Sequence, residues 1–223
     1  MPALKTEKAP IRVVLVEDHT MFREWLGHLI IKKASSVVCG EADNIRDGLA
    51  LIKATKPDIA IVDISLPGSS GLELIKDLKA QEISVPVLVL SMHDEALYAE
   101  RVLRAGARGY ITKLEASTTL LKAIRHVLDG GIYVGEKMTR QMLERISGRA
   151  NSKPTGLDSL ADRELEVFQL IGKGSNGREI AEQLHLGETT IDSYRARIKE
   201  KLQLRNAAEL YSRAAQWIQE HGS

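Results

Sequence analysis

The chain has 223 residues, 43% of them hydrophobic and 27% charged, which is enough for one large domain or two small ones with a buried core. A single cysteine, Cys39, excludes an intramolecular disulfide and fits a reducing compartment. The sequence has neither a signal-peptide core nor a run of about 18 apolar residues, so we expect a cytoplasmic protein without a membrane segment. The formal net charge of +1 gives no global sign of nucleic-acid binding.

The first half of the chain alternates short apolar runs with amphipathic stretches. The runs are nearly continuous and rich in β-branched residues, as in parallel strands covered on both faces, and comprise IRVVLV (11–16), VVCG (37–40), IAIVDI (59–64), VPVLVLS (85–91) and GYIT (109–112). Helical patterns lie between and after them, near 20–33, 45–55, 71–81, 94–105 and 115–129. This alternation of strand and helix patterns predicts an α/β domain over 11–128 with a doubly wound, five-stranded parallel sheet.

The rest of the chain has no strand pattern. Residues 129–156 contain one stretch that fits a short helix, EKMTRQMLERI, followed by a linker-like sequence, SGRANSKPTG. Residues 157–223 indicate an all-α domain of four helices, near 162–172, 177–184, 188–203 and 206–220. Asn176 and Glu179 have the spacing of a helix N-terminal cap, and Gly187 is a candidate cap for the next helix. The short breaks between these helices fit a helix-turn-helix.

Three acidic residues fall where predicted strands end. Glu17 and Asp18 follow the first strand, and Asp63 ends the third. Parallel strands end at one edge of a sheet, where ligands of such folds bind. The three carboxylates would repel one another there unless a cation compensates them. Each acid alone could equally cap a helix or a turn, but the three together favour a site for Mg²⁺, which prefers oxygen ligands.

Two further strand ends complement the acids. Ser91 ends the fourth strand and Lys113 follows the fifth. A lysine beside acids balances their charge and can hold a phosphate group, and a hydroxyl can donate to a phosphoryl oxygen. The five positions together therefore favour a site at which phosphate is placed on a carboxylate.

The segments EDH (17–19), DISLPGSSGLEL (63–74), Ser91 and ARGYITK (107–113) resemble a response-regulator receiver domain over about 11–128. The resemblance implies strand order 2-1-3-4-5 and transfer of a phosphoryl group from a histidine kinase to Asp63. It implies Mg²⁺ bound by Asp18, Asp63 and the backbone carbonyl of Ser65, with Glu17 acting mainly through water. The implied phosphoryl-contact and switch residues are Lys113, the hydroxyl of Ser91 and the aromatic side chain of Tyr110.

Several positions qualify this resemblance. Tyr110 also fits a half-buried strand tyrosine that does not switch. Leu114 follows Lys113 where receivers most often have proline, a mark of the NarL/FixJ branch. In receivers the positions of Ser65 and His93 border the water that attacks the acyl phosphate, so we expect both to tune its lifetime.

The segment LADRELEVFQLIGKGSNGREIAEQLHLGETTIDSYRARIKEKLQLRNAAEL (160–210) resembles a LuxR/NarL-type output domain. The resemblance implies a four-helix domain whose third helix enters the major groove of double-stranded DNA, and whose fourth helix, about 206–217, commonly pairs two subunits. Gly177, before Arg178, stands where lysine is frequent, and Gly187 replaces a usual serine cap. Both changes would weaken local backbone or phosphate contacts.

Charge and helical periodicity locate a reading surface. Residues 157–223 carry nine basic and eleven acidic residues, a net charge of −2, but 195–205 carry five basic residues and one acid. On a helical wheel Ile191, Ile198 and Leu202 face inward. We expect base contacts from the outward face and phosphate contacts from its flanks and from the preceding helix, and the candidates are Arg178, Thr189, Thr190, Asp192, Ser193, Tyr194, Arg195, Ala196, Arg197, Lys199 and Lys201. The alternative interpretation is an ordinary surface helix, which also combines an apolar stripe with charged residues.

These features predict a transcription regulator, not an enzyme, that receives phosphate from a histidine kinase and binds DNA as a homodimer. One alternative is an aspartyl-phosphate hydrolase. Such enzymes typically carry a second acid two residues after the nucleophile, where this chain has Ser65. Another alternative is a binding module whose state is set by a ligand or partner without phosphate.

Overall fold

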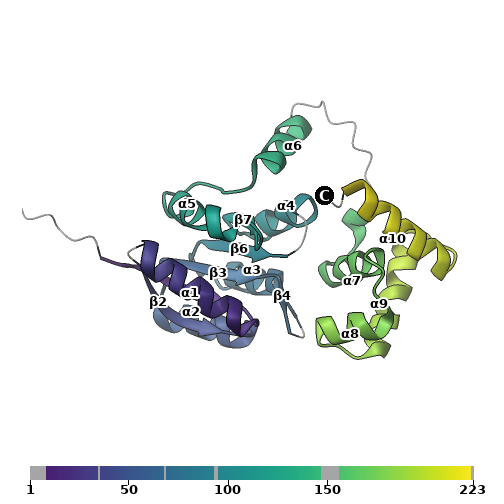
Figure 1. Cartoon of the computed structure of the whole chain (residues 1–223), viewed down its shortest axis with the longest axis horizontal. Helices are drawn as coiled ribbons and strands as arrows, with labels where there is room; N and C mark the ends of the chain where they lie inside the picture. Colours follow the sequence, from purple (N-terminus) through teal and green to yellow (C-terminus); the bar gives the residue numbers. More distant parts are fainter. Residues whose placement is uncertain (1–8, 35, 68, 93–94, 147–155, 222–223) are drawn as a thin grey trace, which may run out of the picture.

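The computed structural model describes residues 9–34, 36–67, 69–92, 95–146 and 156–221. Its first part is a sheet with helices on both faces, and its last part is a group of helices (Figure 1). The main strands are β1 (Ile11–Val16), β2 (Ser36–Ala42), β3 (Ile59–Asp63), β6 (Val87–Ser91) and β7 (Gly109–Thr112). The helices between and after them are α1 (Thr20–Ala34), α2 (Ile45–Thr55), α3 (Gly71–Ala80), α4 (Glu95–Ala105) and α5 (Ala116–Leu128).

The main sheet confirms the predicted fold. Its five strands are all parallel and lie in the order β2-β1-β3-β6-β7, which is 2-1-3-4-5 when only these strands are counted. The register pairs Val16 with Val62, Asp63 with Leu90, and Ser91 with Thr112. The carboxyl ends of the three central strands and of β7 therefore meet at one edge of the sheet.

Apolar residues alternate between two cores, one on each face of the sheet. Val13, Leu15 and Ile61 pack with residues of α1 and α5 on one face. Val14, Val16 and Val62 point to the opposite core, which also takes residues of α2, α3 and α4 and continues into the C-terminal helices. Because both faces of the sheet are buried, the strands are apolar along nearly their whole length.

Two structural details were not predicted from the sequence. A short hairpin, β4 (Ser65–Leu66) and β5 (Ser69–Ser70), follows the acidic end of β3. The turn-rich segment after α5 places Tyr133 beside β7, where its backbone N–H donates to the carbonyl of Arg108 at 2.9 Å and its carbonyl accepts from Tyr110 at 2.8 Å. The absence of a side chain on Gly109 permits this approach, because a Cβ there would lie 2.9 Å from the Tyr133 carbonyl oxygen.

The remaining helices agree with the predicted ones within a few residues. They are α6 (Glu136–Ile146), α7 (Asp162–Gly172), α8 (Gly177–Leu184), α9 (Glu188–Lys201) and α10 (Ala207–His221), with a 3₁₀ turn, η1 (Leu157–Ser159), before α7. Asn176 and Glu179 form the expected reciprocal cap of α8, with Asn176 Oδ1 accepting from Glu179 N at 3.0 Å and Glu179 accepting from Asn176 N at 2.8 Å. Most of the linker-like sequence 147–156 lies outside the described residues. Among the described residues, no helix is long and apolar enough to cross a membrane.

Candidate functional site

Lys113 joins two of the strand-end acids. Its Nζ lies 2.8 Å from Glu17 Oε2 and 2.7 Å from Asp63 Oδ2, and it also lies 4.8 Å from the centre of the Phe22 ring. The three charged side chains are nearly inaccessible to water, with 7%, 3% and 1% of the side-chain surface exposed for Lys113, Glu17 and Asp63. Such a buried ion pair fixes its partners in place, because breaking it would leave an uncompensated charge.

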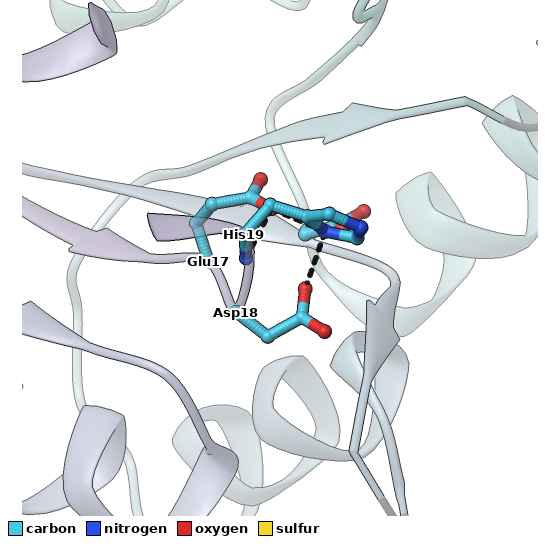
Figure 2. Close-up of side chains that lie close together, drawn as sticks. Glu17, Asp18 and His19 are labelled. Atoms are coloured by element: carbon cyan, nitrogen blue, oxygen red, sulfur yellow. Dashed lines mark hydrogen bonds and ion pairs between the residues drawn. The ribbon is translucent and has the colours of Figure 1, made fainter. Parts of the chain in front are cut away.

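Asp18 and His19 complete the cluster at its outer side. His19 Nδ1 lies 2.8 Å from Asp18 Oδ1 and 3.2 Å from Glu17 Oε1, and Figure 2 shows the three side chains converging. One ligand atom from each of Glu17, Asp18, His19 and Asp63 lies within 4.8 Å of the others. His19 belongs to the EDH motif at 17–19 but was not among the predicted ligands. Its position directly after two acids was the available signal.

Burial dominates the acid–base behaviour of Asp63. It raises the pKa of this carboxyl to about 7, while Lys113 lowers it, Glu17 raises it and the backbone N–H of Ser65 lowers it. Burial alone would lower the pKa of Lys113, but Asp63 and Glu17 raise it above the ordinary value. Because the folded-state pKa of Asp63 is raised, this group contributes less to stability as pH rises from about 4 through 7.

The cluster fits a hard divalent cation. Asp63 Oδ1 is buried and has no hydrogen-bond partner among the described residues, although Oδ2 contacts Lys113. Carboxylate oxygens of Glu17 and Asp18 lie close by, and Ser65 is half-buried at the start of β4. An oxygen-rich site of this kind has the donor chemistry that Mg²⁺ prefers.

The two predicted switch residues lie on neighbouring strands. Ser91 is fully buried at the end of β6, beside β3, and its carbonyl accepts from Lys113 N at 2.8 Å. Tyr110 is fully buried in β7, so the structure places its side chain inside the core instead of half-exposed. His93 lies outside the described residues.

The α8–α9 pair presents a polar outward surface. On α9, Ile191 and Ile198 are fully buried and Leu202 packs against the same core, as the wheel predicted. The exposed candidates are Arg178, Thr189, Thr190, Asp192, Ser193, Ala196, Arg197 and Lys201, whereas Tyr194, Arg195 and Lys199 are half-buried. Thr189, Thr190, Ser193, Tyr194 and Arg197 line a surface hollow of about 370 Å³. Polar side chains around a hollow on an exposed helix can contact phosphates and base edges.

Two basic candidates also have partners inside the domain. Lys201 Nζ lies 2.6 Å from Glu164 Oε2 of α7. Arg195 lies 3.3 Å from Asp192 Oδ1 and 5.8 Å from the ring of Tyr211 in α10. Gly177 leaves room for this arginine, since a Cβ at position 177 would lie 3.0 Å from Arg195 Nη1. Both side chains therefore help to fix α9 against its neighbours.

Comparisons with known proteins agree with this architecture. Residues 13–125 match the family described as "Response regulator receiver domain", and residues 158–214 match "Bacterial regulatory proteins, luxR family". The chain is 33% identical to response regulator UvrY of Escherichia coli K12 over 201 residues, covering 90% of this chain and 91% of that protein. It is 31% identical to response regulator GacA of Pseudomonas aeruginosa, covering 90% of this chain and 93% of that protein.

A solved structure extends the likeness to three dimensions. The structure of the two-component response regulator RcsB in complex with DNA has a TM-score of 0.56 and 25% sequence identity, covering 92% of this chain and 98% of that chain. The two family matches and these relatives cover both the receiver fold and the C-terminal helices. The chain belongs to the NarL/FixJ type of response regulators, DNA-binding transcription regulators in which a receiver domain precedes a LuxR-type helix-turn-helix domain.

Proposed function

We propose that this response regulator accepts a phosphoryl group on Asp63 from a histidine kinase and that the modification promotes its binding to DNA as a dimer. The observation that carries this proposal is the contact of Lys113 with both Glu17 and Asp63 at the carboxyl edge of the sheet. The proposed receiver covers 11–128, a linker covers 129–156, and the DNA-binding domain covers 157–223.

The transfer step uses the carboxylate of Asp63 as nucleophile. One of its oxygens forms a bond to phosphorus while the bond from phosphorus to the kinase histidine nitrogen breaks, which gives an acyl phosphate and a neutral histidine after protonation. Lys113, already 2.7 Å from Asp63, would hold a phosphoryl oxygen as a point charge. Mg²⁺ bound by Asp18, Asp63 and the Ser65 carbonyl, with Glu17 acting through water, would neutralise charge on the transferring group.

The switch follows from the added charge. A phosphoryl group brings negative charge and strong acceptor oxygens to the edge of the sheet. The hydroxyl of Ser91, at the end of the neighbouring strand, would turn toward one of these oxygens. Tyr110 would then settle differently against α4, so that the surface of α4, β7 and α5 shifts between two states.

The DNA-binding surface is assigned to α8 and α9. Asp192, Ser193, Ala196 and Arg197 are proposed to face base edges, since aspartate can accept from cytosine and arginine can bind guanine. The proposed phosphate contacts are Arg178, Thr189, Thr190, Tyr194, Arg195, Lys199 and Lys201. We propose that Asp192 restricts which bases are accepted instead of adding affinity, because its charge repels phosphates.

Selection of DNA from a random pool, with and without a small phosphodonor and Mg²⁺, tests this function. We expect enrichment of a two-fold symmetric site, with half-sites separated by about one helical turn, and stronger enrichment with the phosphodonor. Asp192→Ala should relax the sequence preference at one position of the half-site. Equal enrichment with and without the phosphodonor would support a module that does not use phosphate.

A further inference from the structure

We propose that the pocket around Asp63 also takes a dication of the first transition series, such as Co²⁺, and that His19 is the ligand that distinguishes this ion from Mg²⁺. The inference rests on the proposed metal site at Asp63, and it adds a second class of cation together with the residue that selects it. The carboxylates of Glu17, Asp18 and Asp63 suit either ion, whereas an imidazole nitrogen suits transition metals.

The turn between β1 and α1 holds the backbone of His19 beside the acids. His19 directly precedes α1, and its carbonyl accepts from the backbone N–H of Arg23 at 2.9 Å, as expected of a residue that caps the start of a helix. The backbone N–H of His19 donates to Glu17 Oε1 at 3.1 Å. These two bonds keep the imidazole next to the pocket.

The Nδ1 atom of His19 lies among carboxylate oxygens. It is 2.8 Å from Asp18 Oδ1 and 3.2 Å from Glu17 Oε1, and Figure 2 shows the ring turned toward Asp18. The His19 side chain is 69% exposed, so its ring can turn by a small amount without disturbing the core. This nitrogen is therefore placed to exchange its contact with an acid for a bond to a metal ion that the same acids bind.

A buried oxygen of Asp63 points to a cation independently of the acidic cluster. Asp63 Oδ1 is buried and has no hydrogen-bond partner among the described residues, whereas Oδ2 is bound by Lys113 at 2.7 Å. Only 1% of the Asp63 side chain is exposed, so bulk water does not satisfy this oxygen. A buried carboxylate oxygen without a partner is costly, and a cation would supply the missing interaction.

The spacing of the four ligand atoms fits one ion. One atom from each of Glu17, Asp18, His19 and Asp63 lies within 4.8 Å of all the others. Two ligands of an ion of the size of Zn²⁺, each about 2.1 Å from it, are at most about 4.2 Å apart. Shifts of a fraction of an ångström would therefore bring all four atoms to a single ion, and the exposed ring of His19 has room to make them.

The donor atoms determine which cation gains from His19. Mg²⁺ prefers carboxylates, carbonyls and water, and it keeps several waters in its octahedral shell, so it gains little from an imidazole. Co²⁺ belongs to the transition series whose members bind mixed nitrogen and oxygen sites, and its affinity for such a site exceeds that of Mn²⁺ and Fe²⁺. Removal of the ring should therefore weaken the binding of Co²⁺ and leave the binding of Mg²⁺ nearly unchanged.

The test compares the wild-type chain with His19→Asn, and uses His28→Asn as the matched control. Asparagine keeps the capacity to cap α1 and removes the imidazole. His28 is exposed further along the same helix. For each protein we would measure the affinities for Mg²⁺ and for Co²⁺ by isothermal titration calorimetry, repeat the Co²⁺ titration in excess Mg²⁺, and record the proton NMR spectrum of the Co²⁺ complex.

We expect His19→Asn to bind Co²⁺ at least about tenfold more weakly than the wild type, since loss of a residue that only hydrogen-bonds to a metal ligand already costs that much. Its Mg²⁺ affinity should stay within about twofold of the wild type. The wild-type Co²⁺ complex should show the exchangeable ring N–H proton of a metal-bound histidine, shifted far outside the ordinary range, and His19→Asn should lack this signal. Excess Mg²⁺ should weaken Co²⁺ binding, because the two ions share Asp63. His28→Asn should match the wild type throughout.

Three outcomes would overturn the proposal. Equal Co²⁺ affinities of His19→Asn and the wild type, with the shifted signal in both, would show that His19 is not a ligand. A parallel loss of Mg²⁺ and Co²⁺ affinity would show that His19 only supports the acids and does not select the ion. Co²⁺ that excess Mg²⁺ does not displace would lie at another site. Binding of Co²⁺ through His19 without any binding of Mg²⁺ would instead support this inference and contradict the proposed Mg²⁺ site.

Discussion

Replacing Gly71 by alanine is expected to lower the free energy of unfolding of the receiver by about 3 kcal/mol or more, the upper range for overpacking against atoms that cannot move aside. A Cβ at position 71 would lie 2.0 Å from the carbonyl oxygen of Asp63 and 3.1 Å from the Cα of Ile64. Gly71 also donates from its backbone N–H to the carbonyl of Ile64 at 2.7 Å, which holds α3 against the end of β3. Relief of the clash must therefore move the backbone that carries Asp63, the proposed phosphoacceptor.

Gly27→Ala provides the matched control for Gly71→Ala. Gly27 lies inside α1, and a Cβ there would have ordinary contacts, the nearest at 3.8 Å from Glu41. We expect this substitution to be neutral or to stabilise the chain by about 0.5–1 kcal/mol, because alanine has a lower entropic cost than glycine in a helix. Thermal unfolding followed by circular dichroism should separate the two variants by several degrees or more. Equal midpoints would mean that α3 does not approach Asp63 as closely as described.

Lys113→Ala is expected to have the second large effect. Lys113 is the buried cation that contacts both Glu17 and Asp63, so its removal leaves two buried carboxylates facing each other. Loss of one member of such a pair costs about 3–5 kcal/mol. Phosphorylation by acetyl phosphate should fall by about 10²-fold or more, because the variant lacks the positioned positive charge that we propose stabilises the transferring phosphoryl group.

The stability loss of Lys113→Ala should depend on pH. Burial already raises the pKa of Asp63 to about 7, and Lys113 lowers it, so the variant should hold this carboxyl protonated to higher pH. A raised carboxyl pKa stabilises the folded state at low pH and loses that effect as pH rises, so the variant should be closest to the wild type near pH 5. Lys122→Ala, on the exposed side of α5, is the control and should behave as the wild type at every pH. A constant difference from pH 5 to pH 8 would contradict the assigned electrostatics.

The sequence was sufficient to predict the main sheet and the meeting of its acidic strand ends. The continuous apolar run of β1 and the acids that follow β1 and end β3 are local patterns of the sequence, so they could be recognised without knowledge of the fold. The caps of α8 were equally local, since Asn176 and Glu179 are only three residues apart. For the same reason the inward face of α9 could be predicted from its helical period.

The contacts between distant segments could not be predicted in this way. Arg101 and Arg163 carry no motif, and the backbone carbonyl groups to which they donate come close only when the two domains dock. The partners of Lys201 on α7 and of Arg195 on α10 could not be predicted, because helical spacing gives the direction of a side chain but not its neighbours on other helices. The sequence shows Gly71 only as part of the motif at 63–74. That this position has no room for a Cβ depends on the path of the β3 backbone, which the sequence does not show.

The most direct test of the account is to locate the phosphoryl group itself. The wild-type chain and Asp63→Ala would be incubated with acetyl phosphate and Mg²⁺, treated with borohydride to mark acyl phosphates, digested and examined by mass spectrometry. We expect the label on Asp63 of the wild type and no label on Asp63→Ala, although that variant still folds. An acyl phosphate that persists in Asp63→Ala, or that forms on another carboxylate of the wild type, would contradict the central claim.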